Sequence, residues 1–197
     1  MPTFYYRMET IKSNIILPEG VFEADLDFFT QKDKYYLLKI YQLWRQLSKM
    51  LNKIGARSIN LPEGLSESAF CIAMEVARLK KIYKTNNKIA NSSFDCYNLN
   101  ENKRIQVKSC SVLPDLTSFG PKSQWDELYF LDFYKQGHWL ADFDIYLIPN
   151  DLIYNHHVNK KETFIDHQKQ GRRPRFSIYK DIILEHKILP IKSYSLK

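Results

Sequence analysis

The clearest pattern of apolar positions runs from residue 32 to residue 54. Apolar side chains recur there at steps of three and four residues, the spacing of one face of an α-helix. The stripe consists of Tyr36, Leu37, Ile40, Leu43, Trp44, Leu47, Leu51 and Ile54. Gly55 follows, and glycine commonly ends a helix because it adopts the left-handed conformation without steric cost. We expect a helix here that serves as scaffold or as a dimer interface.

A second apolar stripe predicts a helix that opens in INLPEGLSESAF and runs to about Tyr83. Pro62 suits the first turn, and Glu63 and Glu67 complement the positive end of the helix dipole. The two glutamates are four residues apart and therefore share a face. Two interpretations of them stay open: charge complementarity at the helix terminus, or an additional acid that points at a metal ion.

Alternating residues on either side of Asn100-Glu101 predict a β-hairpin with strands at 94–99 and 104–112. With the turn centred between residues 100 and 101, the numbers of paired residues sum to 201, which places Asp95 opposite Gln106. Opposite residues of an antiparallel pair project to the same face, and Lys108 joins them two residues along. Ile105 and Val107 then point into the core. A single bulge would disrupt this convergence.

The remaining segments complete an α/β fold with a central mixed β-sheet flanked by helices. Residues 1–30 show no clear period apart from a turn at Pro18-Glu19-Gly20. Residues 126–133 predict a strand or a short helix, and 141–149 a buried strand. Residues 150–171 are polar, which indicates a surface excursion. We expect a single domain over 1–197, with a core at about 57–150 that contains the hairpin and a basic C-terminal region at about 150–185.

Charge and composition narrow the class of protein. The chain has 197 residues and a net charge of +7. Residues 150–197 hold ten Lys and Arg against five Asp and Glu, which favours a polyanionic partner such as nucleic acid, although a soluble protein of high pI remains the alternative. Three unpaired cysteines indicate buried thiols in a reducing cytoplasm, and no apolar segment is long enough to span a membrane.

The residues of the hairpin suit hydrolysis of a phosphodiester bond. Asp95 can anchor Mg²⁺, while the Gln106 amide and the Val107 backbone carbonyl can supply further oxygen ligands. Lys108 can position the attacking water and hold the scissile phosphate. The bare pattern of an acid, a later acid or amide, any residue and lysine is weak, since about one match is expected by chance. Two such decoys occur, at 101–103 and at 185–187, but only the hairpin brings its members together.

At these residues the chain resembles the PD-(D/E)XK nuclease superfamily. The matching positions are Glu63 and Glu67 on a preceding helix, Asp95 on the first strand and Gln106-Val107-Lys108 on the second. SSFDCY, QVKS and DLTSFGPKSQWDELYFLDF resemble small type II restriction endonucleases, in particular a group that recognises interrupted GC-N-GC palindromes. The resemblance covers roughly residues 57–185. It implies a restriction-endonuclease-like fold, a Mg²⁺-dependent homodimer that cuts both strands of duplex DNA, and a cognate DNA methyltransferase in the same system.

The chain departs from that superfamily at two positions. Asp95 follows Phe94 rather than proline, and Gln106 stands where an acid is usual. A neutral ligand removes one negative charge from the metal site. Either Mg²⁺ binds more weakly, or Glu67 completes its ligands, and Glu63 is the alternative to Glu67.

Two polar segments are candidate DNA contacts. The loop after the second strand carries Ser118, Lys122 and Gln124, and on the resemblance such a loop would lie against DNA close to the site. The densest basic cluster is Arg172, Arg173 and Arg175, which can hold phosphates. The alternative for both segments is solvated surface. Two rival functions also stay open: a repair or recombination nuclease of the same superfamily, and a non-catalytic DNA-binding protein.

Overall fold

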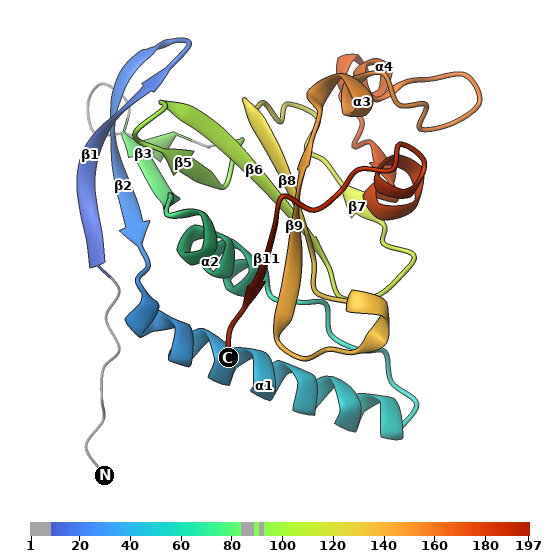
Figure 1. Cartoon of the computed structure of the whole chain (residues 1–197). Helices are drawn as coiled ribbons and strands as arrows, with labels where there is room; N and C mark the ends of the chain where they lie inside the picture. Colours follow the sequence, from blue (N-terminus) through green and yellow to red (C-terminus); the bar gives the residue numbers. More distant parts are fainter. Residues whose placement is uncertain (1–8, 84–88, 91–92) are drawn as a thin grey trace.

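The computed structural model describes residues 9–83, 89–90 and 93–197, and its centre is a curled, mixed β-sheet (Figure 1). The strand order is β1-β2-β3-β5-β6-β8-β9-β11, with β4 paired to β3; β6 and β8 are parallel, and the other pairs are antiparallel. These nine strands of the described chain are β1 (Glu9–Leu17), β2 (Gly20–Phe28), β3 (Ala77–Tyr83), β4 (Ile89–Ala90), β5 (Cys96–Asn98), β6 (Lys103–Cys110), β8 (Glu127–Asp132), β9 (Asp142–Ile148) and β11 (Lys192–Ser195).

Helices cover both faces of the sheet, as the sequence predicts. One face packs against α1 (Gln31–Lys53) and α2 (Glu63–Met74) through a core that includes Phe70, Ile105 and Leu131. The other face packs, through Phe130 and Ile182, against several short elements, most of which follow β9. Those elements are α3 (Asn150–Tyr154), α4 (Phe164–Lys169), the two-stranded sheet of β7 (Thr117–Ser118) and β10 (Arg175–Phe176), and the π-helix η2 (Tyr179–Leu184); a short 3-10 helix, η1 (Lys135–Gly137), joins β8 to β9.

The first predicted helix is confirmed as α1. Thr30 caps it, since its side chain accepts a hydrogen bond from the backbone of Lys32 and the Asp33 carboxylate accepts one from the backbone of Thr30. Leu37 and Trp44 face the core. None of the helices in the described part of the chain combines the length and the apolar character that crossing a bilayer requires.

The second predicted helix is shorter than expected. It ends at Met74, Glu75 adopts a left-handed conformation with φ of 58°, and residues 77–83 form strand β3 instead of a helix. The strand is stabilised by pairing with β2 on one side and β5 on the other. Residues 9–28, for which the sequence showed no period, form the β1–β2 hairpin around the predicted turn.

The predicted hairpin and its register are confirmed. Cys96 pairs with Ile105 and Asn98 with Lys103, so the numbers of paired residues sum to 201. The first strand is shorter than predicted, but the Asp95 amide still donates to the carbonyl oxygen of Ile105 at 2.9 Å. The segment expected to be a strand or a short helix forms a strand at residues 127–132, and the strand expected near 141–149 is confirmed at residues 142–148. The polar segment 150–171 contains two short helices, because Ile153 and Phe164 are buried in the second core.

Candidate active site

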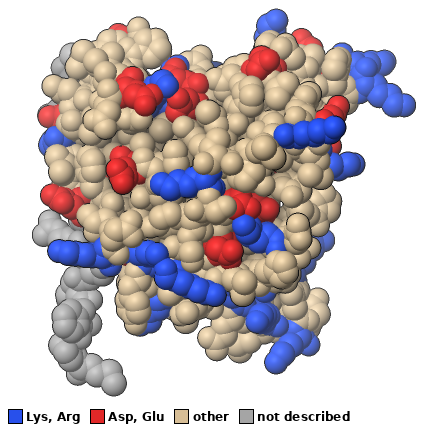
Figure 2. Space-filling model, in the orientation of Figure 1, with Lys and Arg blue, Asp and Glu red and all other residues tan. Residues whose placement is uncertain are grey.

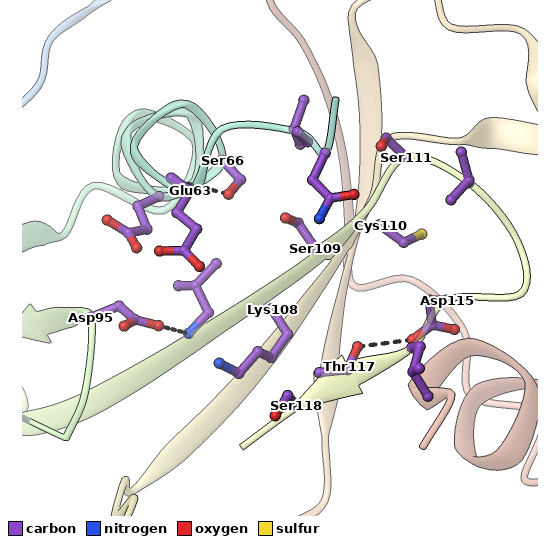
Figure 3. A pocket seen from close by; sticks show the side chains of 16 residues that line it. Glu63, Ser66, Asp95, Lys108, Ser109, Cys110, Ser111, Asp115, Thr117 and Ser118 are labelled. Carbon is purple, nitrogen blue, oxygen red and sulfur yellow. Dashed lines mark hydrogen bonds between the residues drawn. The ribbon is translucent and has the colours of Figure 1, made fainter. Parts of the chain in front are cut away.

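A cavity of about 420 Å³ lies between α2, the start of β5 and the strand β6 (Figure 3). α2 contributes Glu63, Ser66 and Glu67, and the hairpin contributes Asp95 and Lys108. The loop after β6 and strand β7 close the far side. Three of the four predicted catalytic residues, Asp95, Lys108 and Glu67, therefore line one cavity.

Asp95 lines this cavity from the position directly before β5. Its carboxylate accepts a hydrogen bond from the Val107 backbone amide at 2.8 Å and another from the side chain of Gln106. Partial burial raises the pKa of Asp95 above its ordinary value, and the Lys108 ammonium only partly offsets that effect. The Asp95 carboxylate thus accepts hydrogen bonds from neutral donors, but its negative charge is only partly balanced by nearby positive charge.

Gln106 is placed differently from the other three residues. Its side chain is buried beside Asp95, and it is not among the residues that line the cavity. Nε2 faces the Asp95 carboxylate and lies 3.5 Å from the carbonyl oxygen of Val107. A half-turn of the amide exchanges its nitrogen and oxygen, so the same side chain can present a donor or an acceptor at this position.

The acids of α2 face Asp95 across the cavity. Glu67 is half-buried, and Glu63 is exposed at the first turn of the helix. Burial, followed by the negative charge of Asp95, raises the pKa of Glu67 to about 7. Arg78 and Lys108 act in the opposite direction, but they do not cancel these effects. Glu67 and Asp95 are therefore two carboxylates held near each other with too little positive charge around them.

Lys108 is the one basic side chain among the described residues that line the cavity. It is half-buried, and its Nζ lies 5.4 Å from the centre of the Phe119 ring. The fourth acid of the cavity, Asp115, is already satisfied by Thr117, Ser177 and two backbone amides. Asp115 consequently secures the loop and the start of η2, whereas Asp95 and Glu67 keep oxygen atoms directed at the cavity.

The side chains of the cavity supply only some of the ligands that a hard divalent cation needs. Within residues 9–83, 89–90 and 93–197, no three His, Cys, Asp or Glu side chains are grouped closely enough to hold a metal ion. Mg²⁺, however, keeps several of its waters and is commonly bound through one or two carboxylates together with substrate phosphates. Asp95 and Glu67 match that smaller requirement.

The predicted DNA contacts are dispersed around the cavity. Ser118 lines it, and Arg175 pairs with Ser118 across the β7–β10 sheet. Lys122 and Gln124 are exposed outside the cavity. Two further arginines lie on the surface: Arg172, whose guanidinium forms an ion pair with Glu162 at 2.5 Å, and Arg173. The structure therefore brings only one of the six predicted contacts into the cavity and a second next to it.

Several polar side chains of the cavity were missed in the sequence. They are Asn60, Ser66, Ser109 and Ser111. Ser66 is three residues after Glu63 on α2, so helical spacing could have placed it on the same side. Ser109 follows Lys108 directly and Ser111 comes two residues later, but nothing in the local pattern distinguishes them from ordinary serines near the end of a strand.

Comparison with known proteins identifies the family. The family model of the Bsp6I restriction endonuclease matches residues 29–185, which include α1, α2, the hairpin and the cavity but not the β1–β2 hairpin. The type II restriction enzyme Bsp6I of Bacillus sp. (strain RFL6) is 33% identical over 165 residues, which is 81% of this chain and 86% of the relative. No solved structure matches the chain. The chain belongs to the Bsp6I restriction endonuclease family.

Proposed function

We propose that this protein is a Mg²⁺-dependent type II restriction endonuclease of the PD-(D/E)XK superfamily. It would hydrolyse phosphodiester bonds in double-stranded DNA at a short palindrome. The observation that carries this proposal is the cavity in which Asp95, Glu67 and Lys108 meet, in a chain of the Bsp6I family. Fold and family alone would leave the reacting groups unassigned.

The metal would be held by carboxylates from two elements. Asp95 and Glu67 supply anionic oxygens, and the Val107 carbonyl and the Gln106 amide oxygen add neutral ones after a half-turn of that amide. When bound, Mg²⁺ neutralises charge on the phosphate and acidifies a water molecule. Glu67 compensates for the acid that Gln106 replaces, because its carboxylate faces the same cavity as Asp95.

Lys108 would act on the substrate and not on the metal. Its ammonium is a compact point charge on a long stem, and it lies in the same cavity as the two carboxylates. From there it can donate to a non-bridging oxygen of the scissile phosphate and orient the attacking water. Its Nζ lies near the face of the Phe119 ring, and this cation–π contact favours that position of the amine.

DNA would lie across the mouth of the cavity. Ser118 and Arg175 lie at or beside it, and Lys122, Gln124, Arg172 and Arg173 would reach the duplex farther out. Lysine and arginine contacts to phosphates hold DNA without reading its sequence, whereas side-chain amides and arginine can also read base edges. A homodimer would bring one cavity to each strand of a palindrome, of the GC-N-GC kind on the resemblance to that group. A cognate methyltransferase would protect host DNA.

Cleavage of plasmid DNA in Mg²⁺ tests this function. We expect discrete fragments from wild type and from Lys187→Ala, and intact plasmid from Lys108→Ala and Asp95→Ala. Lys187 is a matched control because it ends the decoy 185–187, on an exposed surface away from the cavity. Nicking that depends on DNA structure would favour a repair nuclease, and tight binding without cleavage a DNA-binding protein. Full cleavage by Lys108→Ala would reject the assigned site.

A further inference from the structure

Helix α1 carries a second apolar stripe on a side that faces solvent. Leu43 is 57% exposed, Leu47 47%, Met50 57% and Ile54 78%. Ile40 lies at the partly buried border of the same stripe. Isolated exposed apolar residues are ordinary, but a contiguous row of them along one helix marks a surface that binds something apolar.

This stripe is separate from the side of α1 that packs on the protein. Leu37, Tyr41 and Trp44 face the core, where they contact residues of α2 and the sheet. Figure 1 shows α1 along the lower edge of the molecule, with the sheet and α2 on one side of it. The exposed stripe therefore lies where a second body can approach.

The spacing of the stripe is that of a helix-pairing seam. From Ile40 the apolar positions follow at steps of three, four, three and four residues, which is the a/d repeat of a coiled coil. In two antiparallel copies whose paired positions sum to 90, Leu47 meets the partner's Leu43, and Ile40 meets the partner's Met50. A stripe that matches itself in this way suits a two-fold symmetric contact.

The core side of α1 is connected to the candidate active site. The Trp44 indole donates to the Ile59 carbonyl oxygen at 2.9 Å, which fastens the segment after α1 to the helix. The next two residues, Asn60 and Leu61, line the cavity. Under the proposed function, a homodimer joined through α1 would carry one cavity in each copy, and cleavage of both strands of one palindrome requires two cavities.

We propose that the exposed stripe of α1, residues Ile40, Leu43, Leu47, Met50 and Ile54, is the interface of a homodimer with antiparallel α1 helices. The choice of a second copy as partner rests on the proposed function, because a palindrome presents two equivalent scissile bonds. The interface itself rests on the exposure, spacing and self-complementarity of the stripe.

Charges beside the stripe give this interface a distinctive salt dependence. Lys39 and Lys53 are exposed on the adjacent face, and the antiparallel arrangement brings Lys39 near the partner's Lys53. Figure 2 shows Lys and Arg side chains along the edge of the molecule where α1 lies. Salt screens such repulsion, so moderate salt strengthens the dimer while it weakens DNA binding.

The first test measures the mass of the DNA-free protein by light scattering. We expect a dimer for wild type and a monomer for Leu47→Glu, with dimerisation weakened at least about a hundredfold because two carboxylates would be buried against leucine. Gln42→Glu adds the same charge on the polar side of the helix and should remain dimeric. Thermal unfolding of each variant verifies folding, since Leu47 is half-exposed in the single chain.

The second test fixes the register by charge pairing. Leu43→Lys combined with Leu47→Glu places the introduced ammonium of one copy against the introduced carboxylate of the other in the antiparallel arrangement. The double variant should therefore recover the dimerisation that Leu47→Glu loses. In a parallel pair, like charges would meet and no recovery would follow. A monomeric wild type, a dimeric Leu47→Glu, or a double variant that stays monomeric would each overturn the proposal.

Plasmid cleavage separates this proposal from the proposed function. Leu47→Glu should accumulate nicked circles, because each monomer retains one intact cavity. Complete inactivity of wild type would reject the nuclease but leave the mass measurements unaffected. Double-strand cleavage by a Leu47→Glu protein shown to be monomeric on DNA would contradict the stated role of the interface.

Discussion

Two buried or half-buried aspartates of the same sheet have opposite surroundings. Asp27, on β2, is fully buried and accepts hydrogen bonds from Arg78 at 2.9 Å and Thr10 at 2.6 Å, with the Lys80 ammonium 3.6 Å away. Asp95, at the start of β5, accepts hydrogen bonds from the neutral amides of Val107 and Gln106, and no basic side chain of the described residues donates to it. One carboxylate is neutralised by the chain itself, and the other is not.

The pKa values reflect that difference. Burial alone would raise the pKa of Asp27, but the hydrogen bonds from Thr10 and Arg78 outweigh it and lower the pKa below its usual value. Burial of Asp95 is not outweighed, so its pKa is raised. The same fold balances the negative charge of Asp27 with nearby cations but leaves the negative charge of Asp95 incompletely balanced. A cation from solution can supply the missing positive charge at Asp95. We therefore infer a structural role for Asp27 and a role in catalysis for Asp95.

The largest expected effect follows from removing the Asp95 charge. Asp95→Asn keeps the shape of the side chain but loses an anionic ligand, and cleavage of duplex DNA in Mg²⁺ should fall at least about a thousandfold. Thermal stability without Mg²⁺ should be unchanged or higher, because an uncompensated charge is removed. A loss of stability comparable to that of the corresponding Asp27 variant would place Asp95 among structural residues.

The same substitution at Asp27 should act on stability. Asp27→Asn leaves Arg78 without its main partner, and the free energy of unfolding should fall by about 3 kcal/mol. Urea unfolding measures this loss. Cleavage per folded molecule, measured at low temperature, should remain close to that of wild type. A catalytic defect in folded Asp27→Asn would contradict a purely structural role for Asp27.

Glu67 provides an intermediate case within the cavity. Glu67→Gln should reduce cleavage about ten- to hundredfold, because one of two anionic ligands becomes neutral. Without Mg²⁺ this variant should be slightly more stable than wild type, since burial and Asp95 both disfavour the Glu67 carboxylate. Glu63→Gln is the matched control on the same helix. A larger defect at Glu63 would transfer the supporting role to that residue.

The smallest expected effect comes from adding an acid. Gln106→Glu places an additional carboxylate in contact with Asp95, so stability without Mg²⁺ should fall by about 1–2 kcal/mol. The Mg²⁺ concentration for half-maximal cleavage should fall by up to about tenfold, because a charged ligand binds the cation more strongly. An unchanged Mg²⁺ requirement together with the lower stability would exclude position 106 from the metal site.

The hairpin could be predicted from sequence because its determinants are local. Alternation on both strands and the turn fix a register, and that register placed Asp95 beside Gln106 and Val107. The residues of the cavity could not be predicted from strand alternation alone, since Glu67 belongs to a separate helix. The resemblance supplied that link, and the packing of α2 on β6 provides its physical basis.

Other parts of the fold depended on contacts between distant residues. Val76 and Leu79 extend the helical stripe of α2, yet the chain reverses at Glu75 because β3 pairs with β2 and β5. The β1–β2 hairpin has one strand at the edge of the sheet with mostly exposed side chains, so its alternation is weak. The partner of Asp27 lies 51 residues away in the chain, and no local pattern reveals such a pair.

The most direct measurement is calorimetric titration of Mg²⁺ into the DNA-free protein, with Asp95→Asn and Asp27→Asn alongside wild type. We predict binding to wild type and to folded Asp27→Asn, and at least about tenfold weaker binding to Asp95→Asn, since the cation completes the charge that the chain leaves uncompensated at Asp95. Equal affinity of wild type and Asp95→Asn for Mg²⁺ would contradict the account.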